Sequence, residues 1–477
     1  MKCKARLTFM SRDFWQEVSG IMEATAMLRD FATSIVKTLC QRGFQAYLVG
    51  GCVRDLLLGR APKDYDVATN ATPDQVMSLF PETYAVGAQF GVVLVPAPET
   101  EGARDGLNEV GAKSHAVEVA TFRSDIGYSD GRHPDEVRFS RDPRADVARR
   151  DFTINGMLLD PVTSEVLDFV GGRKDLEAGI IRTIGDPEQR FSEDKLRMLR
   201  AVRFAARFEY AIEPATFAAV EKLAHQIDVV SRERVRDELT RMLTEGHARR
   251  ALLLLDASGL LNQVLPQISA MKGVEQPLEF HPEGDVFVHT LLVLDNLPNP
   301  CPKTLAWGAL LHDVGKPPTF RVAPDRIRFD GHVEVGVKMA EEICRGLRFS
   351  NDETEQILAL VDNHMRFGHA TRMKESTLKK FLRMPAFDQH LALHRADCLA
   401  SHRNLSTYEF VQQKQAEIPS EKMRPLALVT GDDLIAEGHL PGPKFREILS
   451  AVEDAQLEGR LPSRDAALEF VRREFPV

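Results

Sequence analysis

Apolar positions follow two different periods along this chain, and the change of period divides it into parts. Short apolar runs typical of buried strands occur in four places, near residues 47–49, 64–68, 91–95 and 116–122. A helical pattern covers Met22 to Arg42, and from about Leu176 onward the apolar residues recur every three or four positions. This order predicts an α+β chain in which a strand-containing head domain is followed by an all-α neck and body.

Proline and glycine residues refine this division. The polar, glycine-rich stretch from Pro96 to His115 indicates a surface insertion between two strands of a hairpin, where added length costs little. Several prolines around Pro277 end the first helical block, and a second block begins near Asp285. We therefore expect five parts, namely an N-terminal extension (1–21), a head domain (22–161), a helical neck (162–276), a second helical domain (277–405) and a C-terminal helical tail (406–477).

The composition fits a multidomain cytoplasmic protein. A chain of 477 residues is expected to form roughly two to four domains, and 43% hydrophobic residues suffice for several cores. No apolar run is long enough to span a membrane, and the N-terminus lacks a cleavable signal pattern. The six cysteines are scattered without a C-x-x-C pair, which indicates reduced thiols rather than disulfides or a zinc site.

A glycine pair between a strand and a helix is the best indication of chemistry. The apolar run Tyr47–Val49 ends at Gly50 and Gly51, and a short helical segment follows. Glycines here let the backbone approach a phosphate, whose charge is attracted by the amides at the helix start. The next strand carries Asp64 and Asp66, whose side chains point the same way because side chains alternate along a strand. The arrangement suits Mg²⁺ held against a triphosphate, although each piece alone is common in ordinary turns and strand edges.

Residues 46–69 together resemble the catalytic head of the class II tRNA nucleotidyltransferase and bacterial poly(A) polymerase family, a branch of the polymerase-β-like nucleotidyltransferases. The resemblance implies a mixed sheet with helices, in which Asp64 and Asp66 hold Mg²⁺. It also implies transfer of a nucleoside monophosphate from ATP or CTP to the 3′-hydroxyl of tRNA, which builds the CCA end. Arg54, next to the glycine pair, is expected to neutralise phosphate charge. No protein partner is implied.

A third carboxylate for this site is expected at Glu118. It lies in the alternating run Ala116 to Ala120, where its apolar neighbours face away from it. An exposed glutamate on a half-buried strand would give the same pattern. The resemblance favours the metal-site role, because the family's head often has an acid on the strand before an element similar to residues 121–123.

Residues 149–157 are similar to the family's ribose-recognition motif. Asp151 and Asn155 are spaced by one helical turn, which suits polar contacts to a ribose. The resemblance implies nucleotide contacts from these two residues and from Arg150. The one departure from the family pattern is Gly156, which we expect to loosen a helix at this place by up to ~1 kcal/mol.

The run Glu193-Asp194-Lys195-Leu196-Arg197 falls where the family carries its base-reading motif. Spacings of three and four residues put Glu193, Asp194 and Arg197 on one helical face, although the same pattern is usual for a salt-bridged surface. In the family, Asp194 and Arg197 would pair with the base edge of ATP or CTP. Glu193 would orient Arg197.

Basic residues concentrate in the helix that follows, despite a net charge of −9. Between Arg190 and Phe208, six basic residues accompany only two acidic ones. Arg200, Arg203 and Arg207 repeat at helical spacing, so they are expected to share one face and to bind an RNA phosphate backbone. A solvated helix face would show the same spacing.

Histidines concentrate in the second helical domain, where nine of the fourteen lie between His281 and His402. The candidate metal ligands fall on separate helical stretches, at His289, His312, Asp313, His332, His364 and Asp397. The first three with Asp397 suit one divalent metal, and His332 with His364 would complete a second site. The set resembles that of HD phosphohydrolase domains, which are all-α and which some tRNA nucleotidyltransferases carry behind the head and neck.

Three alternatives remain open at this point. A poly(A) polymerase would use the same head, but this chain is acidic and Gly87 is followed by Ala88-Gln89-Phe90 instead of a basic pair. An enzyme that adds only A also stays open, whereas one that adds only CC is disfavoured because residues 124–139 resemble the flexible loop that such enzymes lack. The intact Asp64 and Asp66 oppose the third alternative, an RNA-binding phosphohydrolase with an inactive head.

Overall fold

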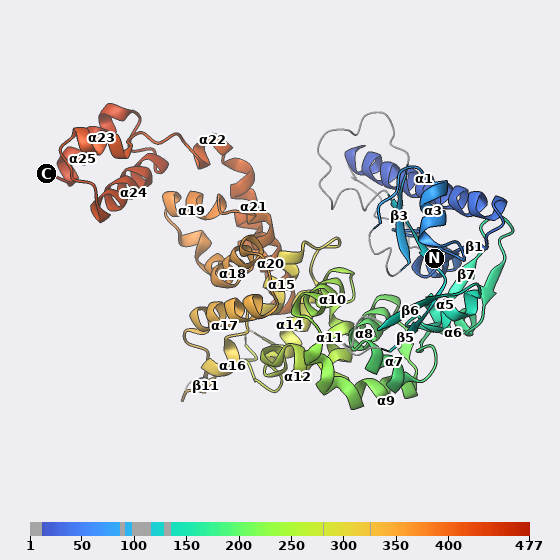
Figure 1. Ribbon diagram of the computed structural model, residues 1–477. Helices are drawn as coiled ribbons and strands as arrows, with labels where there is room; N and C mark the ends of the chain where they lie inside the picture. The colour runs from blue at the N-terminus through green and yellow to red at the C-terminus, as the bar shows by residue number, and fades with distance from the viewer. Residues whose placement is uncertain (1–11, 86–90, 98–115, 128–134, 280, 325) are drawn as a thin grey trace, which may run out of the picture. The chain divides into compact units, whose positions relative to one another are not determined.

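The computed structural model describes residues 12–85, 91–97, 116–127, 135–279, 281–324 and 326–477 (Figure 1). The start of the expected N-terminal extension, most of the expected insertion, residues 87–90 and the middle of loop 124–139 lie outside them. The chain divides into two compact units, Met1–Ser231 with Ala257–Leu260, and Arg232–Asp256 with Leu261–Val477. The five expected parts are smaller than these units, and their boundaries remain predictions.

The first unit is built on a six-stranded sheet with the order β3-β4-β2-β1-β7-β8. Its strands are β1 (Ala46–Val49), β2 (Asp66–Thr69), β3 (Val92–Pro96), β4 (Ala116–Thr121), β7 (Met157–Leu159) and β8 (Val166–Asp168). β2 and β4 pair in parallel and the other neighbours are antiparallel, which confirms the α+β class and the mixed sheet. The strand predicted over 64–68 starts at Asp66, so Asp64 and Tyr65 precede it.

Helices accompany the sheet and extend the first unit. α1 (Arg12–Gln41) lies along β1 and β2, and buries Ile35, Val36 and Leu39 (Figure 1). The other helices of this unit are α2 (Gly51–Leu57), α3 (Pro73–Leu79), α5 (Pro143–Ala148), η3 (Thr153–Asn155), α6 (Gly172–Ala178), α7 (Pro187–Glu193), α8 (Leu196–Phe208), α9 (Pro214–Leu223) and η4 (Ala224–Val229). Two further strand pairs are β5–β6 (Arg123–Ile126, Glu136–Phe139) and β9–β10 (Ile180–Ile181, Ala211–Ile212).

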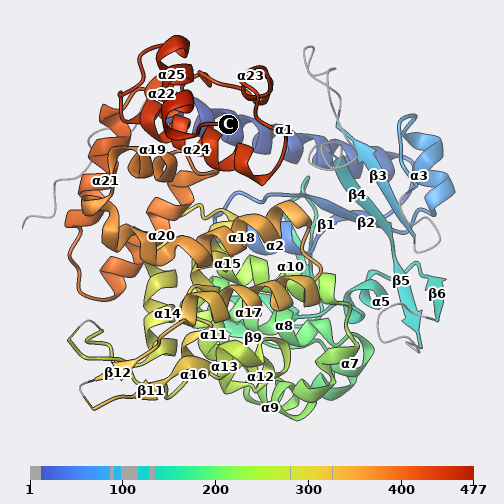
Figure 2. The same ribbon diagram turned by 90° about the vertical axis from the view of Figure 1, so that its left-hand side faces the viewer.

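The second unit is helical, as predicted, and α15 (Lys303–Leu311) lies at its centre (Figure 2). Its neighbours are α10 (Arg232–Thr244), α14 (Val286–Asp295), α18 (Asn351–Asn363) and α20 (Phe387–Ala400). Because these helices surround α15, every residue from Leu305 to Leu311 is buried. Trp307 donates from its indole nitrogen to Thr240 at 2.9 Å, which joins α15 to α10. α17 (His332–Gly346) packs on α18 and follows the hairpin β11–β12 (Arg321–Val322, Ile327–Arg328).

The last helices of this unit form a smaller group with its own core (Figure 2). α23 (Gly431–Ala436), α24 (Pro443–Leu457) and α25 (Arg464–Glu474) bury Leu434, Ile448, Val452 and Val471 among themselves. The remaining helices are α11 (Ala248–Ala257), α12 (Leu260–Val264), α13 (Pro266–Ser269), α16 (Lys316–Thr319), η5 (His364–Arg372), α19 (Glu375–Leu382), α21 (Ser406–Glu417) and α22 (Ser420–Met423). Within the described ranges, no helix has both the length and the apolar character needed to cross a membrane.

Candidate active sites

The glycine pair ends β1 directly beside a predicted metal ligand. In the antiparallel pair of β1 and β2, Val49 lies opposite Asp66, so the turn at Gly50 begins next to that carboxylate. Gly50 has a φ of 79°, and a Cβ on it would lie 3.2 Å from the Arg150 guanidinium and 3.7 Å from Asp66 Oδ2. A side chain at Gly50 would be strained and would fill the space beside the carboxylate. The glycine therefore keeps the approach to Asp66 open.

The three predicted carboxylates of the head lie together. Asp66 on β2 is in parallel register with Glu118 on β4, and Asp64 lies two positions before Asp66. Tyr65 between the two aspartates is buried, whereas Asp64 is exposed. Burial, Glu118 and Asp64 raise the pKa of Asp66 to about 7, against the opposing effect of Arg150. Their mutual repulsion and their oxygen chemistry fit a divalent cation such as Mg²⁺.

A buried acid that the sequence did not single out, Asp146 on α5, holds two arginines beside this site. Its carboxylate accepts from Arg149 at 2.6 Å and from Arg150 at 3.0 Å, and it is fully buried. The charge of Arg150 opposes the rise in the pKa of Asp66. The backbone carbonyl of Arg149 accepts from Arg197 at 3.1 Å. Asp146 thus positions residues next to both the carboxylates and the expected base-reading motif.

The residues expected to contact a ribose form hydrogen bonds with other side chains of the protein. Asp151 accepts from Arg200 at 2.6 and 2.9 Å and from the Asn155 amide at 3.1 Å. Burial opposes the ionisation of Asp151, but Arg200 and Asn155 outweigh it and lower the pKa of that carboxyl to about 2. The segment is the 3₁₀ turn η3 rather than the α-helical turn that the spacing predicted.

Arg54 is buried, which corrects the expectation that its charge is offered to a phosphate. Its side chain is 4% exposed. It donates to Asp55 at 2.9 Å and to Asn155 Oδ1 at 2.6 Å, and it lies 4.7 Å from the ring centroid of Phe208. Burial lowers the pKa of Arg54, while Asp55 opposes this effect. Arg54 therefore fixes Asn155 relative to α2.

Gly156 also differs from expectation. It follows the turn η3, and a Cβ on it would lie 2.8 Å from Ile184 Cδ1 and 2.9 Å from Val170 Cγ2. Side chains of Ile184 and Val170 therefore occupy the space that an alanine methyl would need. Glycine is a packing requirement here, and the predicted loosening of a helix does not apply.

The expected base-reading residues lie on two helices instead of one. α7 ends at Glu193, and Asp194 adopts an extended conformation with its carboxylate accepting from the Leu196 amide at 3.1 Å. The break corrects the prediction of a single helical face. Even so, Arg197 donates to Glu193 at 2.7 Å, which is the pairing that the resemblance implied. Arg197 also donates to the backbone carbonyl of Arg190 at 3.1 Å, so its guanidinium is held from several sides.

The three arginines predicted to bind an RNA backbone are not a fully exposed face of α8, and their RNA-binding role stays a prediction. Arg203 is 4% exposed and lies 4.2 Å from the ring centroid of Phe204. Arg200 is committed to Asp151, and half-buried Arg207 lies 5.3 Å from the ring centroid of Phe208. Phe204 and Phe208 lie among these arginines on α8. The arginine side chains pack on the two rings, so they lie against the protein.

In the second unit, four histidines turn one ring nitrogen toward a common centre. Their Nδ1 atoms are each held by another group: His312 by the Ala309 carbonyl at 2.8 Å, His332 by Phe329 at 2.9 Å, His364 by Val361 at 2.6 Å, and His289 by the Glu283 carboxylate at 2.6 Å. The Nε2 atoms of these histidines are buried. Among the described residues, those of His312, His332 and His364 have no hydrogen-bond partner, whereas His289 Nε2 faces the Asp397 carboxylate at 3.1 Å. A fixed Nδ1–H and a free Nε2 are typical of imidazoles that bind a metal.

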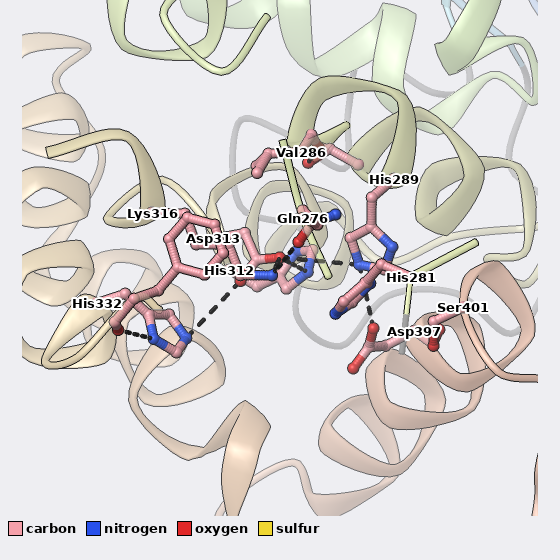
Figure 3. A network of polar contacts seen from close by, with 12 residues as sticks. Gln276, His281, Val286, His289, His312, Asp313, Lys316, His332, Asp397 and Ser401 are labelled. Carbon is pink, nitrogen blue, oxygen red and sulfur yellow. Dashed lines mark hydrogen bonds and ion pairs between the residues drawn. The ribbon is translucent and has the colours of Figure 1, made fainter. Parts of the chain in front are cut away.

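Asp313 lies at the middle of these nitrogens (Figure 3). Its Oδ2 is 3.2 Å from His312 Nε2 and 3.8 Å from His289 Nε2, and its Oδ1 is 3.8 Å from His364 and 3.9 Å from His332. Asp397 Oδ1 lies 3.1 Å from His289 Nε2. Five of the six predicted ligands thus form two donor groups that share Asp313, and the sixth, Asp397, lies beside His289. Imidazole and carboxylate donors in this number fit a divalent transition metal.

The charges in this centre fit a metal as well. Burial lowers the pKa of His289, but Asp397 and Glu283 outweigh burial and raise it to about 9. Burial and the neighbouring His312 lower the pKa of His364 to about 4. His364 is therefore a neutral ligand at pH 7, and the proton on His289 takes the place of a cation.

Comparisons with known proteins support both parts of the chain. The family models described as "Poly A polymerase head domain", "Probable RNA and SrmB- binding site of polymerase A" and "tRNA nucleotidyltransferase domain 2 putative" match residues 46–182, 209–272 and 332–471. The CCA-adding enzyme of Bacillus pumilus is 38% identical over 284 residues, and that of Geobacillus stearothermophilus 42% over 238 residues. These matches cover 60% and 50% of this chain, and 63% and 55% of the relatives. The chain thus spans little more than half the length of these curated relatives.

Solved structures extend the likeness over almost the whole chain. The Bacillus stearothermophilus CCA-adding enzyme in complex with CTP is 27% identical, with a TM-score of 0.70 over 93% of this chain and 97% of that one. The Thermotoga maritima CCA-adding enzyme complexed with tRNA, 19% identical with a TM-score of 0.55, shares the fold over 93% of this chain and 94% of that one. Three consecutive family models and this fold lead to one conclusion. The chain belongs to the family of class II tRNA nucleotidyltransferases and bacterial poly(A) polymerases.

Proposed function

We propose that this protein is a CCA-adding enzyme, which transfers CMP and AMP from CTP and ATP to the 3′ end of tRNA. The observation that carries the proposal is the group of carboxylates Asp64, Asp66 and Glu118 beside the open turn at Gly50. Arg197, held by Glu193, supports selection of the base. Relatives named CCA-adding enzymes support the same activity. We place the protein in the cytoplasm because its proposed substrate is tRNA.

The residues of the head have separate tasks in this reaction. Two Mg²⁺ ions held by Asp64 and Asp66 would lower the pKa of the 3′-hydroxyl and stabilise the leaving pyrophosphate. The 3′-oxygen bonds to the α-phosphorus while the bond to pyrophosphate breaks, and the hydroxyl proton passes to solvent. Gly50 leaves room for the triphosphate beside the carboxylates. Arg197 offers donors and Asp194 an acceptor to the base edge.

A test of this function uses purified protein and tRNA that ends before CCA. CTP alone, ATP alone and both together are supplied, and the products are separated by length. Addition of CCA followed by a stop supports the proposal. Long A tails on varied RNAs would identify a poly(A) polymerase, and addition of one A only to tRNA that already ends in CC would identify an A-adding enzyme.

We further propose that the second unit carries an HD-type metal phosphohydrolase. Four buried Nε2 atoms around Asp313 motivate this, since unpartnered imidazoles are costly without a metal. A metal bound there with an open coordination position supplies an activated water. The proposed substrate is a 2′,3′-cyclic phosphate or a terminal phosphate at an RNA 3′ end, because either blocks the hydroxyl that the head extends. The water oxygen bonds to phosphorus, one ester P–O bond breaks, and the ribose oxygen takes the proton.

Hydrolysis of both ester types is to be measured with Mn²⁺, Ni²⁺, Co²⁺ and Mg²⁺. The double variant His312→Ala/Asp313→Ala serves as the control, and its activity is expected to be lost. Absence of hydrolysis with every metal, together with a lowered melting temperature in the double variant, would leave the donors with a structural role only.

A further inference from the structure

The metal donors of the second unit line one side of a pocket of about 410 Å³. Among the donors, His312, Asp313, His332, His364 and Asp397 border this space. Its other side is formed by residues 326–330, which comprise strand β12 and the turn that leads to α17. A ligand bound to the metal would therefore also touch this segment, whose residues do not belong to the predicted HD set.

The segment brings positive charge to the pocket. Arg326 and Arg328 both line it, and Arg326 is exposed. Lys316 lines it as well, although its ammonium group already donates to Asp313 at 2.7 Å and to Gln276 at 2.5 Å (Figure 3). The one acid of the segment, Asp330, has a side chain 69% exposed and pairs with Arg321 at 2.8 Å. An exposed arginine in the lining of a pocket that holds metal donors suits an anionic group, and guanidinium binds phosphate through charge-assisted hydrogen bonds.

Phe329 adds an aromatic surface between these charges. Phe329 lines the pocket, and its ring lies 5.4 Å from the Lys316 ammonium and 6.0 Å from the ring centroid of Phe320, which is 40% exposed. The backbone carbonyl of Phe329 holds His332 Nδ1 at 2.9 Å. The same residue thus orients a metal donor through its backbone and belongs to the lining of the ligand space. Aromatic rings beside phosphate-binding arginines are the usual means of holding a nucleotide, whose base stacks on the ring.

We propose that Arg326 and Phe329, presented by the hairpin β11–β12, form the substrate-recognition element of the metal site. They take the terminal nucleotide of an RNA 3′ end that carries a phosphate ester. Arg326 binds phosphate oxygens, and the Phe329 ring packs on the nucleoside. This inference rests on the proposed phosphohydrolase function and names the residues that give it a preference for nucleotides over simple phosphate esters.

The test compares a nucleotide substrate with a simple one in the metal-loaded full chain. The substrates are adenosine 2′,3′-cyclic phosphate and p-nitrophenyl phosphate. Arg326→Ala and Phe329→Leu are the test variants. Arg321→Ala is the matched control, because Arg321 belongs to the same hairpin and pairs with Asp330 but is not itself part of the pocket lining. Bound metal per chain is measured for every variant, and the affinity for adenosine 3′-monophosphate is measured by calorimetry.

The expected result is a loss of nucleotide binding at unchanged metal content. Arg326→Ala should raise KM for the cyclic nucleotide about tenfold or more, with kcat within about threefold, because a charge-assisted contact to phosphate is lost. Phe329→Leu should raise KM for the cyclic nucleotide about tenfold and leave that for p-nitrophenyl phosphate within about twofold, because only the nucleotide has a base to stack. Arg321→Ala should behave as wild type with both substrates.

Different outcomes separate this inference from the phosphohydrolase proposal. Hydrolysis by wild type with the same KM and the same nucleotide affinity in both test variants would overturn the recognition element and keep the activity. Absence of hydrolysis, with adenosine 3′-monophosphate bound by wild type and lost in Arg326→Ala, would overturn the activity and keep the recognition element. Absence of both hydrolysis and nucleotide binding in wild type would overturn both.

Discussion

Asp66 lies directly opposite Glu118 on two parallel neighbouring strands, and this register gives the head a carboxylate pair whose charges repel each other. Burial together with Glu118 and Asp64 raises the pKa of Asp66 to about 7. Ionised Asp66 is therefore unfavourable in the folded protein without a cation. The same repulsion supports metal binding, because a divalent ion relieves it.

Replacing Asp66 should raise the stability of the metal-free protein while it abolishes nucleotide addition. Protonation of Asp66 favours the folded state fully below about pH 4, and this contribution is lost as pH rises through about 7, because the folded-state pKa lies above the ordinary value. With a metal chelator present at pH 8, the melting temperature of Asp66→Asn should therefore be about 2–4 °C higher than that of wild type. Near pH 4 the two melting temperatures should be equal. Mg²⁺ should raise the melting temperature of wild type more than that of the variant.

The same variant should lose nucleotide addition. Asp66→Asn, Asp66→Ala and Asp64→Ala each remove a carboxylate that is placed for metal binding, and we expect addition to fall by more than about a hundredfold. Primer extension on tRNA lacking CCA measures this, with tRNA binding as the control for folding. Addition within about tenfold of wild type in all three variants would contradict the metal assignment.

Arg197 and Glu193 offer a test of base selection. Arg197→Ala should reduce the preference for CTP and ATP over UTP and GTP about 10- to 100-fold, because the base edge loses its donors. Glu193→Gln should have a smaller effect in the same direction, since Arg197 keeps its bonds to the carbonyls of Arg190 and Arg149. The ratio of kcat/KM among the four nucleotides measures both, with Lys195→Ala as control. Intact selectivity with a lower rate would mean that Arg197 has another role.

Arg200 forms an ion pair with Asp151, so its contribution to the free energy of unfolding should depend on pH. Arg200→Ala leaves the buried carboxylate of Asp151 without its main counter-charge and should cost about 1–3 kcal/mol of unfolding free energy at pH 7, since part of Arg200 is exposed to solvent. The pKa of Asp151 is lowered to about 2, so this stabilisation is present above about pH 4 and is lost as pH falls toward 2. Denaturant unfolding at pH 7 and pH 3 measures the difference. An equal loss at both values would contradict the assignment.

The sequence predicted best where a local pattern decides the geometry. Alternation around Glu118 set its side chain apart from its apolar neighbours, because a buried strand fixes which side chains share a side, and the family resemblance assigned Glu118 to the site of Asp66. The set of histidines was found for a similar reason, since unpartnered imidazoles are rare in helical cores. The break after Glu193 escaped prediction because the Asp194 carboxylate accepts from the Leu196 amide, a local bond that competes with helix continuation.

Long-range contacts set the limits of that prediction. Arg200 and Arg203 have the spacing of an exposed stripe, and only the fold brings Asp151 and the Phe204 ring against them. Gly156 is likewise explained by Ile184, twenty-eight positions away in the sequence. Asp146 stands three and four positions before Arg149 and Arg150, a helical spacing that could have singled it out, whereas Glu283 stands six positions before His289. An acid close to a predicted metal-binding histidine is the one signal that favoured Glu283.

Glu283 should set the metal affinity of the second unit. Its Oε1 accepts from His289 at 2.6 Å and from His281 at 2.9 Å, which fixes the His289 ring with Nε2 toward Asp313 and Asp397. Burial opposes the ionisation of Glu283, but His281 and His289 outweigh it and lower its pKa to about 2, so the carboxylate stays charged at every practical pH. Glu283→Ala should weaken metal binding about 10- to 100-fold, and Glu283→Gln by less, because an amide oxygen still accepts from the ring.

Competition between the protein and a chromophoric chelator for Ni²⁺ or Co²⁺ measures these affinities without any assumption about activity. Glu279→Gln is the matched control, since Glu279 is an exposed acid in the same loop. Melting temperatures in chelator show whether each variant folds as wild type does. The expected order of affinity is wild type and Glu279→Gln, then Glu283→Gln, then Glu283→Ala. Equal affinity in all four proteins would show that His289 is oriented by its own packing in α14 and that Glu283 does not support the metal.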